Sequence, residues 1–238
     1  MSTKPRPKAE AILMGNEAIA LGLIENGCRM APAYPGTPAS EILASVAIYQ
    51  KRLNIDMHTQ WAVNEKVALE IAYAGSMAGL RTAVSMKQVG LNVASDPMMS
   101  AAYMGCAGGF VIVSADDPGP HSSQTEQDSR MMAMMAKIPV LDPDSPHQAK
   151  DMVASAFALS ETFKTPVMLR PTTRVCHSRQ DVAPGEIVET TAAPDFKKDP
   201  SRWAATPKFR YQLHLELEEK LARIAAHPDT GPVLRNPQ

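Results

Sequence analysis

An acidic side chain stands at the beginning of a stretch that is otherwise apolar or small. The stretch is AVNEKVALEIAYAGSMAG, residues 62–79, and the acid is Glu65. Its predicted apolar neighbours are Val63, Val67, Ala68 and Ile71. Such neighbours would desolvate a carboxyl and help it share a proton with a ligand, whereas a helix N-terminus favours the carboxylate by about 0.3–1 kcal/mol. The residues alone leave two interpretations open: a proton-sharing group of a binding site, or an ordinary first-turn acid on the helix dipole.

Three further segments carry polar groups of the kinds that bind ligands or transfer protons. They are YPGTPASE (34–41), MKQVGLN (86–92) and SADDPGPHSSQTEQD (114–128). In the first, two prolines stiffen a turn that presents the hydroxyl of Thr37 and several backbone N–H groups, and Ser40 is predicted to cap the next helix. A rigid strand-to-helix turn without a ligand explains these residues equally well.

The other two segments contain candidate binding groups beside glycine. Lys87, Gln88 and Asn92 surround Gly90, where the backbone can come close to a ligand. His121 lies after two aspartates in a loop rich in Gly and Pro. The alternative for both segments is ordinary loop chemistry, in which turn carbonyls satisfy the polar side chains.

Several common site motifs are missing from the sequence. There is no G-x-G-x-x-G after a strand, no G-x-x-x-x-G-K-[ST] and no G-x-S-x-G, so the usual nucleotide-binding and serine-nucleophile signatures are absent. The six histidines have no metal-ligand spacing, and the three cysteines form no C-x-x-C pair. The sequence therefore predicts neither a metal site nor an iron–sulfur cluster within this chain.

Composition limits the partners and the compartment. The chain has 238 residues, of which 45% are hydrophobic, enough for one substantial core. Its net charge of −1 comes without any basic block, which makes nucleic acid an unexpected partner. No apolar run approaches the roughly 20 residues of a membrane span, and the N-terminus has no signal-peptide h-region. We therefore expect a soluble, cytoplasmic protein that does not enter a membrane.

Apolar runs alternate with helical periods along the chain. The runs predict strands at 29–34, 57–63, 81–87, 108–115, 138–143 and 165–172. The periods predict helices at 16–26, 40–53, 64–80, 91–105, 124–137 and 146–164. Continuous apolar strands that alternate with helices are typical of a parallel sheet covered on both faces. The prediction is an α/β fold with a doubly wound, mostly parallel sheet over residues 1–180, then a linker and docking helix (207–227) within 181–238.

The polar segments all follow predicted strands. In a doubly wound sheet, ligands bind beyond the carboxyl ends of the strands, where loops lead into helix N-termini. We therefore expect residues 34–41, 62–65, 86–92 and 114–128 to lie at one edge of the sheet, around a ligand that the residues alone do not identify.

At this point the residues resemble a known family. The blocks that carry the resemblance are YPGTPASEI, WAVNEKVALEIAYAGS, SMKQVGLNVASDPMMSAAY, GGFVIVSADDPGPHSSQTEQDSR, AKIPVLDPDSPHQAKDM and TTRVCHSR. They follow one another without interruption from about residue 12 to residue 220. Together they resemble the N-terminal, pyrimidine-binding domain of thiamine-diphosphate-dependent 2-oxoacid:ferredoxin oxidoreductases, and most nearly the alpha subunit of the indolepyruvate type.

The resemblance implies a role for Glu65. In thiamine enzymes a glutamate hydrogen-bonds N1′ of the aminopyrimidine ring, so that the exocyclic nitrogen of the ring can remove the proton from C2 of the thiazolium. Glu65 matches that glutamate. The small residues Ala68, Ala72, Gly75 and Gly79 form a stripe where a helix or a second subunit could approach closely.

Further roles follow from the same motif match. Thr37 is expected near the substrate or the reactive end of the cofactor, in a turn with Pro35 and Gly36. The loop beside the aminopyrimidine corresponds to Lys87, Gln88, Gly90 and Asn92. Four residues are expected to face the substrate pocket or the partner domain: Asp116, Asp117, His121 and Arg130. Of these, His121 and Arg130 are the candidates for substrate binding.

Whole members of this family have parts that this sequence does not contain. They grip the diphosphate and its Mg²⁺ with a second thiamine domain, and they pass electrons through 4Fe–4S clusters to ferredoxin. The resemblance therefore implies that this chain holds only the aminopyrimidine end of thiamine diphosphate, and that a partner subunit supplies the diphosphate-binding domain and the clusters. The expected reaction is oxidative decarboxylation of indolepyruvate or another arylpyruvate to the acyl-CoA.

One segment departs from the family pattern. SRMMAMMAKIP carries methionines at 131, 132, 134 and 135, where relatives usually have polar, aromatic and basic residues that suit a substrate carboxylate. The methionines could line an apolar substrate pocket, or form the core face of a helix. Three functions consequently stay open: a catalytic subunit, a non-catalytic assembly or regulatory subunit with the same fold, and a truncated product without activity.

Overall fold

A six-stranded parallel sheet forms the centre of the protein. A computed structural model describes residues 3–4, 11–188, 190 and 193–230. The strands lie in the order β4-β3-β5-β6-β8-β7, and every neighbouring pair is parallel. Their bounds are β3 Met30–Ala33, β4 His58–Trp61, β5 Thr82–Lys87, β6 Phe110–Ala115, β7 Val140–Leu141 and β8 Val167–Leu169. Each predicted strand is present in shortened form, so the doubly wound α/β fold is confirmed.

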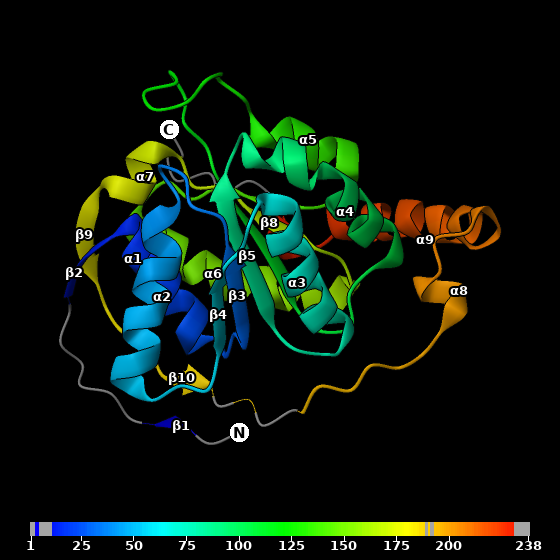
Figure 1. The fold of residues 1–238 in the computed structure, drawn as a ribbon, viewed down its shortest axis with the longest axis horizontal. Helices are drawn as coiled ribbons and strands as arrows, with labels where there is room; N and C mark the ends of the chain where they lie inside the picture. The colour runs from blue at the N-terminus through cyan, green and yellow to red at the C-terminus, as the bar shows by residue number, and fades with distance from the viewer. Residues whose placement is uncertain (1–2, 5–10, 189, 191–192, 231–238) are drawn as a thin grey trace.

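Helices cover both faces of this sheet (Figure 1). One face packs against α1 (Gly15–Glu25), α2 (Ser40–Leu53) and α6 (Pro146–Phe163). The opposite face packs against α3 (Glu65–Met77), α4 (Gly90–Met104) and α5 (Ser129–Ala136). Each predicted helix occurs. Only α5 differs substantially from its predicted bounds: the predicted start at residue 124 is wrong, and the helix begins at Ser129.

The central strands divide their side chains between two cores. In β6, Val111 and Val113 belong to the core under α1, α2 and α6, whereas Phe110 and Ile112 belong to the core under α3, α4 and α5. Successive side chains of a strand point to opposite faces, so a continuous apolar run is what two buried faces require. The same physics explains why these strands could be read from the sequence.

Two short antiparallel ribbons flank the sheet and were not predicted. β2 (Ala11–Met14) pairs with β9 (Arg179–Val182), and β1 (Thr3–Lys4) pairs with β10 (Ile187–Val188). β9 crosses the predicted domain boundary at residue 180. The division of the chain into 1–180 and 181–238 stays a prediction.

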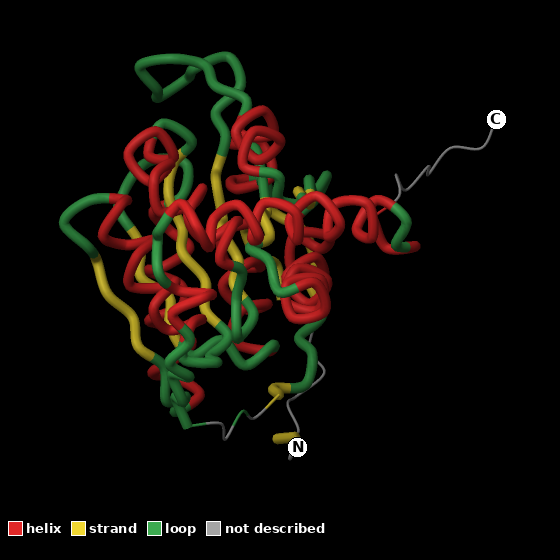
Figure 2. The backbone as a smooth tube through the Cα atoms, turned by 90° about the vertical axis from the view of Figure 1, so that its right-hand side faces the viewer, coloured by secondary structure: helices red, strands yellow, loops and turns green. Residues whose placement is uncertain are grey.

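The C-terminal segment returns along the side of α4. It contains α8 (Pro200–Trp203), α9 (Pro207–Ala225) and the short η1 (Pro228–Thr230), with a five-residue helix, α7 (Thr173–His177), earlier in the chain. Figure 2 shows the backbone turned by 90° from the view of Figure 1, with helices in red and strands in yellow. The hydroxyl of Tyr103 lies 3.1 Å from Nδ1 of His214, and these two rings stack, which places α9 against α4. In the described part of the chain, no helix combines the length and apolarity that crossing a bilayer requires.

Candidate functional site

The candidate site lies where the strand order reverses direction. The chain passes from β3 outward to β4 and then back to β5 on the other side of β3, so the loops after β3 and β5 leave the sheet next to each other. A Cβ placed on Gly36, in the first loop, would lie 3.1 Å from Cβ of Lys87 at the end of β5. This is the crevice in which doubly wound sheets bind ligands.

Glu65 reaches this crevice from α3. The helix begins at Glu65 because Asn64 caps it: the Asn64 side chain accepts a hydrogen bond from Val67 N at 2.9 Å. The half-buried Glu65 side chain lies directly against Gly90, where an added Cβ would come 2.5 Å from Cγ and 2.6 Å from Oε1 of Glu65. Two residues of the predicted cofactor site are therefore in contact.

The apolar surroundings predicted for Glu65 are only partly present. Ala68 is buried, and Val67 and Ile71 are partly buried. Val63, however, is 80% exposed, so the prediction that it desolvates Glu65 is wrong. Val63 lies in the connection between β4 and α3, one residue before the cap Asn64.

The turn that carries Thr37 is stabilised by Asn16, a buried residue that the sequence analysis did not single out. Thr37 and Pro35 are exposed, and the Thr37–Pro38 peptide is cis. Asn16 is fully buried, and its amide donates to Pro38 O at 2.7 Å and to Glu41 Oε2 at 2.8 Å. Nothing local in the sequence marks Asn16, because its partners lie 22 and 25 residues away.

Ser40 has a different role from the predicted one. The cap of α2 is Ala39, and Ser40 is the first residue of the helix. Its hydroxyl accepts a hydrogen bond from Gly36 N at 2.8 Å. Ser40 therefore stabilises the turn rather than the helix end.

Lys87 and Gln88 bind the loop that precedes α5. Lys87 Nζ donates to Ser122 O, and Gln88 Nε2 donates to Ser123 Oγ at 3.0 Å and to Thr125 O at 3.5 Å. Gln88 is fully buried, and its Oε1 has no hydrogen-bond partner among the described residues. A buried acceptor without a donor is uncommon in folded proteins and is a position that a ligand or a water can satisfy. Asn92, one turn further on, is exposed.

Asp117 anchors the same loop. It accepts hydrogen bonds from Ser123 Oγ at 2.6 Å, Ser122 N at 2.8 Å and Thr173 Oγ1 at 2.9 Å. Burial alone would raise the pKa of this carboxyl, but the hydrogen bonds from Ser123, Ser122 and Thr173 outweigh burial and lower the pKa of Asp117 to about 2. Asp117 is thus ionised and structural, while His121 in the middle of the loop is exposed.

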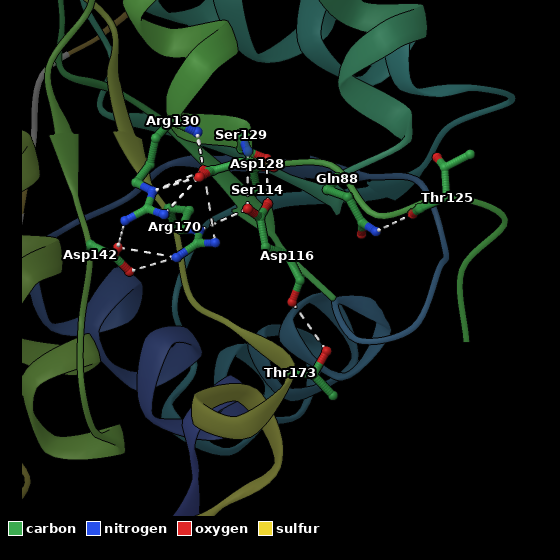
Figure 3. Close-up of polar contacts among 10 residues, drawn as sticks. All are labelled: Gln88, Ser114, Asp116, Thr125, Asp128, Ser129, Arg130, Asp142, Arg170 and Thr173. Carbon is green, nitrogen blue, oxygen red and sulfur yellow. Dashed lines mark hydrogen bonds and ion pairs between the residues drawn. The ribbon is translucent and has the colours of Figure 1, made fainter. Parts of the chain in front are cut away.

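A network of alternating charges fixes the far end of the loop (Figure 3). Arg170 is 7% exposed and pairs with the fully buried Asp116 at 2.7 Å and with Asp142 at 3.1 Å. Asp116 also binds the backbone N–H and the hydroxyl of Ser129 at the start of α5. The network joins the ends of β6, β7 and β8.

Arg130 belongs to the outer part of this network. It pairs with Asp128 at 2.7 Å and with Asp142 at 3.6 Å. The hydrogen bonds from Arg130 lower the pKa of Asp128 to about 2. The guanidinium of Arg130 is thus engaged within the chain, although it is half exposed.

The methionines of α5 do not form a core face. Met131, Met134 and Met135 are 56%, 68% and 64% exposed, whereas Ala133 and Ala136 pack inward. The prediction of a methionine-rich core face is therefore wrong. The helical spacing of 131, 134 and 135 was read correctly, but spacing does not state which face of a helix is buried.

The described residues contain no group of His, Cys, Asp or Glu that could hold a metal ion. The three cysteines are free and buried, and burial raises the pKa of Cys28 and of Cys106 to about 12. Neither thiol is suited to metal binding or nucleophilic chemistry in this state.

Comparison with known proteins identifies the family. Residues 21–230 match the family model described as pyruvate flavodoxin/ferredoxin oxidoreductase, thiamine diphosphate-binding. The chain belongs to this family. The family resemblance that the sequence motifs predicted is confirmed.

Named relatives give the same result. Indolepyruvate oxidoreductase subunit IorA of Thermococcus kodakarensis is 46% identical over 95% of this chain and 36% of its own length. The IorA subunit of Archaeoglobus fulgidus is 44% identical over 90% of this chain and 35% of its own length. The chain thus spans about a third of the length of these relatives.

A solved structure shares the fold. The 2-oxoglutarate:ferredoxin oxidoreductase of Magnetococcus marinus superposes with a TM-score of 0.72, at 18% sequence identity, over 93% of this chain and 46% of that one. At this identity the likeness concerns the fold alone.

Proposed function

We propose that this chain is the pyrimidine-domain subunit of a split thiamine-diphosphate-dependent 2-oxoacid:ferredoxin oxidoreductase. The observation that carries the proposal is the contact of Glu65 with Gly90 at the strand-order reversal, in a chain that belongs to a thiamine-diphosphate-binding family. When bound, the cofactor supplies a carbon nucleophile that attacks 2-oxoacids. The chain supplies the groups that hold and activate its pyrimidine end.

Glu65 is the proposed proton partner of pyrimidine atom N1′. Gly90 has no side chain, and the Glu65 carboxyl occupies the space beside it. Any other residue at position 90 would place its Cβ in that space. The buried, unpartnered Oε1 of Gln88 lies two residues before Gly90 and fits a ligand that donates a hydrogen bond. The residues present therefore suit an aminopyrimidine, with Lys87 and Asn92 beside the same loop.

The substrate side of the site is proposed from the positions of exposed side chains. The exposed Thr37, with Pro35 and Gly36 in its turn, is the candidate group near the reacting atoms. His121 is exposed and free to face a substrate. Arg130 would have to exchange Asp128 or Asp142 for a substrate carboxylate. The exposed methionines of α5 favour an apolar substrate body, as in indolepyruvate or another arylpyruvate.

A partner subunit completes the proposed enzyme. The relatives are named as subunits, and this chain spans about a third of their length. We propose that the partner carries the diphosphate-binding domain with Mg²⁺ and the 4Fe–4S clusters, passes electrons to ferredoxin, and works with this chain in the cytoplasm, with coenzyme A as acyl acceptor.

The test is a substitution that keeps the shape of the side chain. In the complex purified with its partner, Glu65→Gln is expected to abolish 2-oxoacid-dependent reduction of an electron acceptor and to leave assembly intact. Activity that survives this change would show that Glu65 has been assigned wrongly.

A non-catalytic assembly or regulatory subunit is the second candidate. It is favoured by the exposed methionines at 131, 134 and 135. The family resemblance leads us to expect a basic residue near 134 that pairs with a substrate carboxylate. A partner that oxidises 2-oxoacids equally well with wild-type chain and with Glu65→Gln chain would support this second function.

A further inference from the structure

A pocket of about 630 Å³ lies at the amino edge of the sheet, opposite the edge that holds Glu65. Its inner wall consists of the segments that follow α3 and α4 and lead into β5 and β6. Its outer wall consists of residues 193–203 and α9. Pockets of roughly 300–1,000 Å³ accommodate small organic molecules.

The cations of this pocket outnumber the carboxylates left to pair with them. Arg202 is paired with Glu216 at 2.8 Å, and Asp199 caps the N-terminus of α8. The remaining charged residues of the wall are Asp195, Lys164, Lys197 and Lys220. Among the described residues, no carboxylate lies within 4.0 Å of any of these three ammonium groups.

Lys220 is the most enclosed of the three. Its Nζ donates to Lys164 O at 3.0 Å, and burial lowers the pKa of Lys220. Lys164 Nζ in turn donates to Ala107 O at 3.3 Å. Lys164 is the C-cap of α6, so the bond to its carbonyl offsets the negative end of that helix. Each ammonium group has three N–H donors, so both lysines keep donors for a ligand. The carboxylate of Glu216 raises the pKa of Lys220, but Glu216 is itself paired with Arg202.

The rest of the wall is apolar or aromatic. Trp203 is half-buried, and its indole N–H donates to Lys197 O at 3.0 Å, which fixes the ring. Met77 and Met104 line the pocket from the ends of α3 and α4. Thioether and indole groups suit flat or aliphatic bodies, and the lysines suit anions.

We propose that this pocket is a second ligand site, separate from the cofactor edge, and that it takes an organic anion. A carboxylate or phosphate group is held by Lys220 and Lys164, and its apolar or aromatic body packs on Trp203 and the two methionines. Because α8 and α9 form the outer wall, the bound anion strengthens the contact of the C-terminal segment with α3 and α4. The inference does not depend on the proposed reaction.

The fluorescence of Trp203 gives a direct test. The sequence has two tryptophans, so Trp61→Phe leaves Trp203 as the single reporter. The probe is 8-anilinonaphthalene-1-sulfonate, and the matched control is N-phenyl-1-naphthylamine, which lacks the sulfonate. We expect saturable quenching of Trp203, with the anionic probe bound about tenfold more tightly, the effect of one charge-assisted hydrogen bond.

Lysine variants locate the anion. Lys220→Gln is expected to weaken the anionic probe about tenfold. The control Lys208→Gln changes a lysine of the same helix outside the pocket and is expected to change nothing. If Lys220→Gln disturbs α9 by circular dichroism, Lys164→Gln gives the same test from outside α9. Competition by octanoate or by adenosine 5′-monophosphate then distinguishes a carboxylate from a phosphate ligand.

Three outcomes would overturn the proposal. They are the absence of saturable quenching, equal affinity for the charged and neutral probes, and unchanged affinity in both lysine variants. None of these measurements uses Glu65, so the proposed function is tested separately.

Discussion

At the scale of single residues, the carboxyl of Glu65 has its position because residue 90 is glycine. The two residues lie on different helices, 25 positions apart, and an added Cβ at 90 would overlap the Glu65 side chain. The clash concerns the flexible end of a side chain rather than backbone. A substitution at 90 should therefore displace the carboxyl while the fold survives.

Gly90→Ala is expected to reduce 2-oxoacid oxidation by the complex about a hundredfold, as misplacement of a reacting group by about 1 Å does. Thermal unfolding should change little. Assembly with the partner provides the control, because a change that only displaces the carboxyl leaves assembly intact. Wild-type activity of the Gly90→Ala complex would contradict this explanation.

Asp117 makes stability depend on pH. Its pKa is lowered from 3.8 to about 2, so the folded state binds a proton less readily than the unfolded state. The stabilisation is complete above about pH 4 and is lost as the pH falls toward 2. Urea unfolding should thus show Asp117→Asn less stable than wild type at pH 6, with a gap that narrows below pH 4. The exposed control Asp56→Asn should differ little from wild type in its free energy of unfolding. If the difference between wild type and Asp117→Asn grows as the pH falls, the lowered pKa of Asp117 is contradicted.

The sequence could place residues beside helix starts at one edge of the sheet, and it could not place residues whose partners are distant in the chain. Glu65 and Gly90 are first-turn residues after predicted strands, so their edge of the sheet could be predicted. Asn16 and Arg170 could not, because Asn16 binds Pro38 across 22 positions and Arg170 binds Asp116 across 54. Periodicity carries no information about such pairs.

At the scale of elements, Arg170 connects the ends of three strands to α5. Removing one member of a buried ion pair leaves the other without compensation, at a cost of about 3–5 kcal/mol. Arg170→Met should lower the free energy of unfolding by this amount in denaturant titrations. The exposed pair of Lys66 with Asp96 is the control, and Lys66→Met should have no measurable effect. Equal effects of the two substitutions would argue against a structural role for the network.

Helix α9 buries one side against the domain and leaves another free. Leu217 is 1% exposed and Leu215 is 42% exposed, although both are leucines of the same turn. Leu217→Ala should destabilise the protein by about 2–5 kcal/mol, whereas Leu215→Ala should stay within about 0.5 kcal/mol. Calorimetry of both variants tests this packing. A helix that docks only on a partner would make both changes neutral in the isolated chain.

The amphipathic period of α9 was visible in the sequence, and so were the continuous strands. The start of α5 was not visible, because residues 124–128 have a helix-compatible composition. Gln88 holds Ser123 and Thr125 in a loop from 35 and 37 positions away, and such a distant contact leaves no local signal. The ribbons β2–β9 and β1–β10 join the two ends of the domain. Short strands with distant partners carry too few residues to show a period.

At the scale of the whole molecule, the proposed site is open. Three apolar side chains are exposed at the same edge as the methionines of α5. They are Trp61 at the end of β4 (47%), Val63 just after it (80%) and Val93 in the first turn of α4 (48%). Apolar side chains gathered at one edge are typical of surfaces that contact another protein. The proposed diphosphate-binding subunit would cover them.

The isolated chain is therefore expected to be inactive. Added alone to a 2-oxoacid, thiamine diphosphate, Mg²⁺ and an electron acceptor, it should give no reduction above background. Activity should appear on addition of the partner and saturate at a fixed ratio of the two chains. Purification from the native cell supplies the partner, recognised by iron–sulfur absorbance; activity of the solitary chain would refute the split-enzyme proposal.

The sheet order also has a consequence for synthesis of the protein. β3 cannot pair with β5 until β4, α3 and β5 have emerged from the ribosome. Gly90 emerges only after β5. Glu65 therefore lacks its contact with Gly90 until about 25 further residues have been synthesised. This synthesis takes roughly 1–5 s at 5–20 residues per second. A nascent chain stalled between α3 and α4 would contain the glutamate without the surface that positions it.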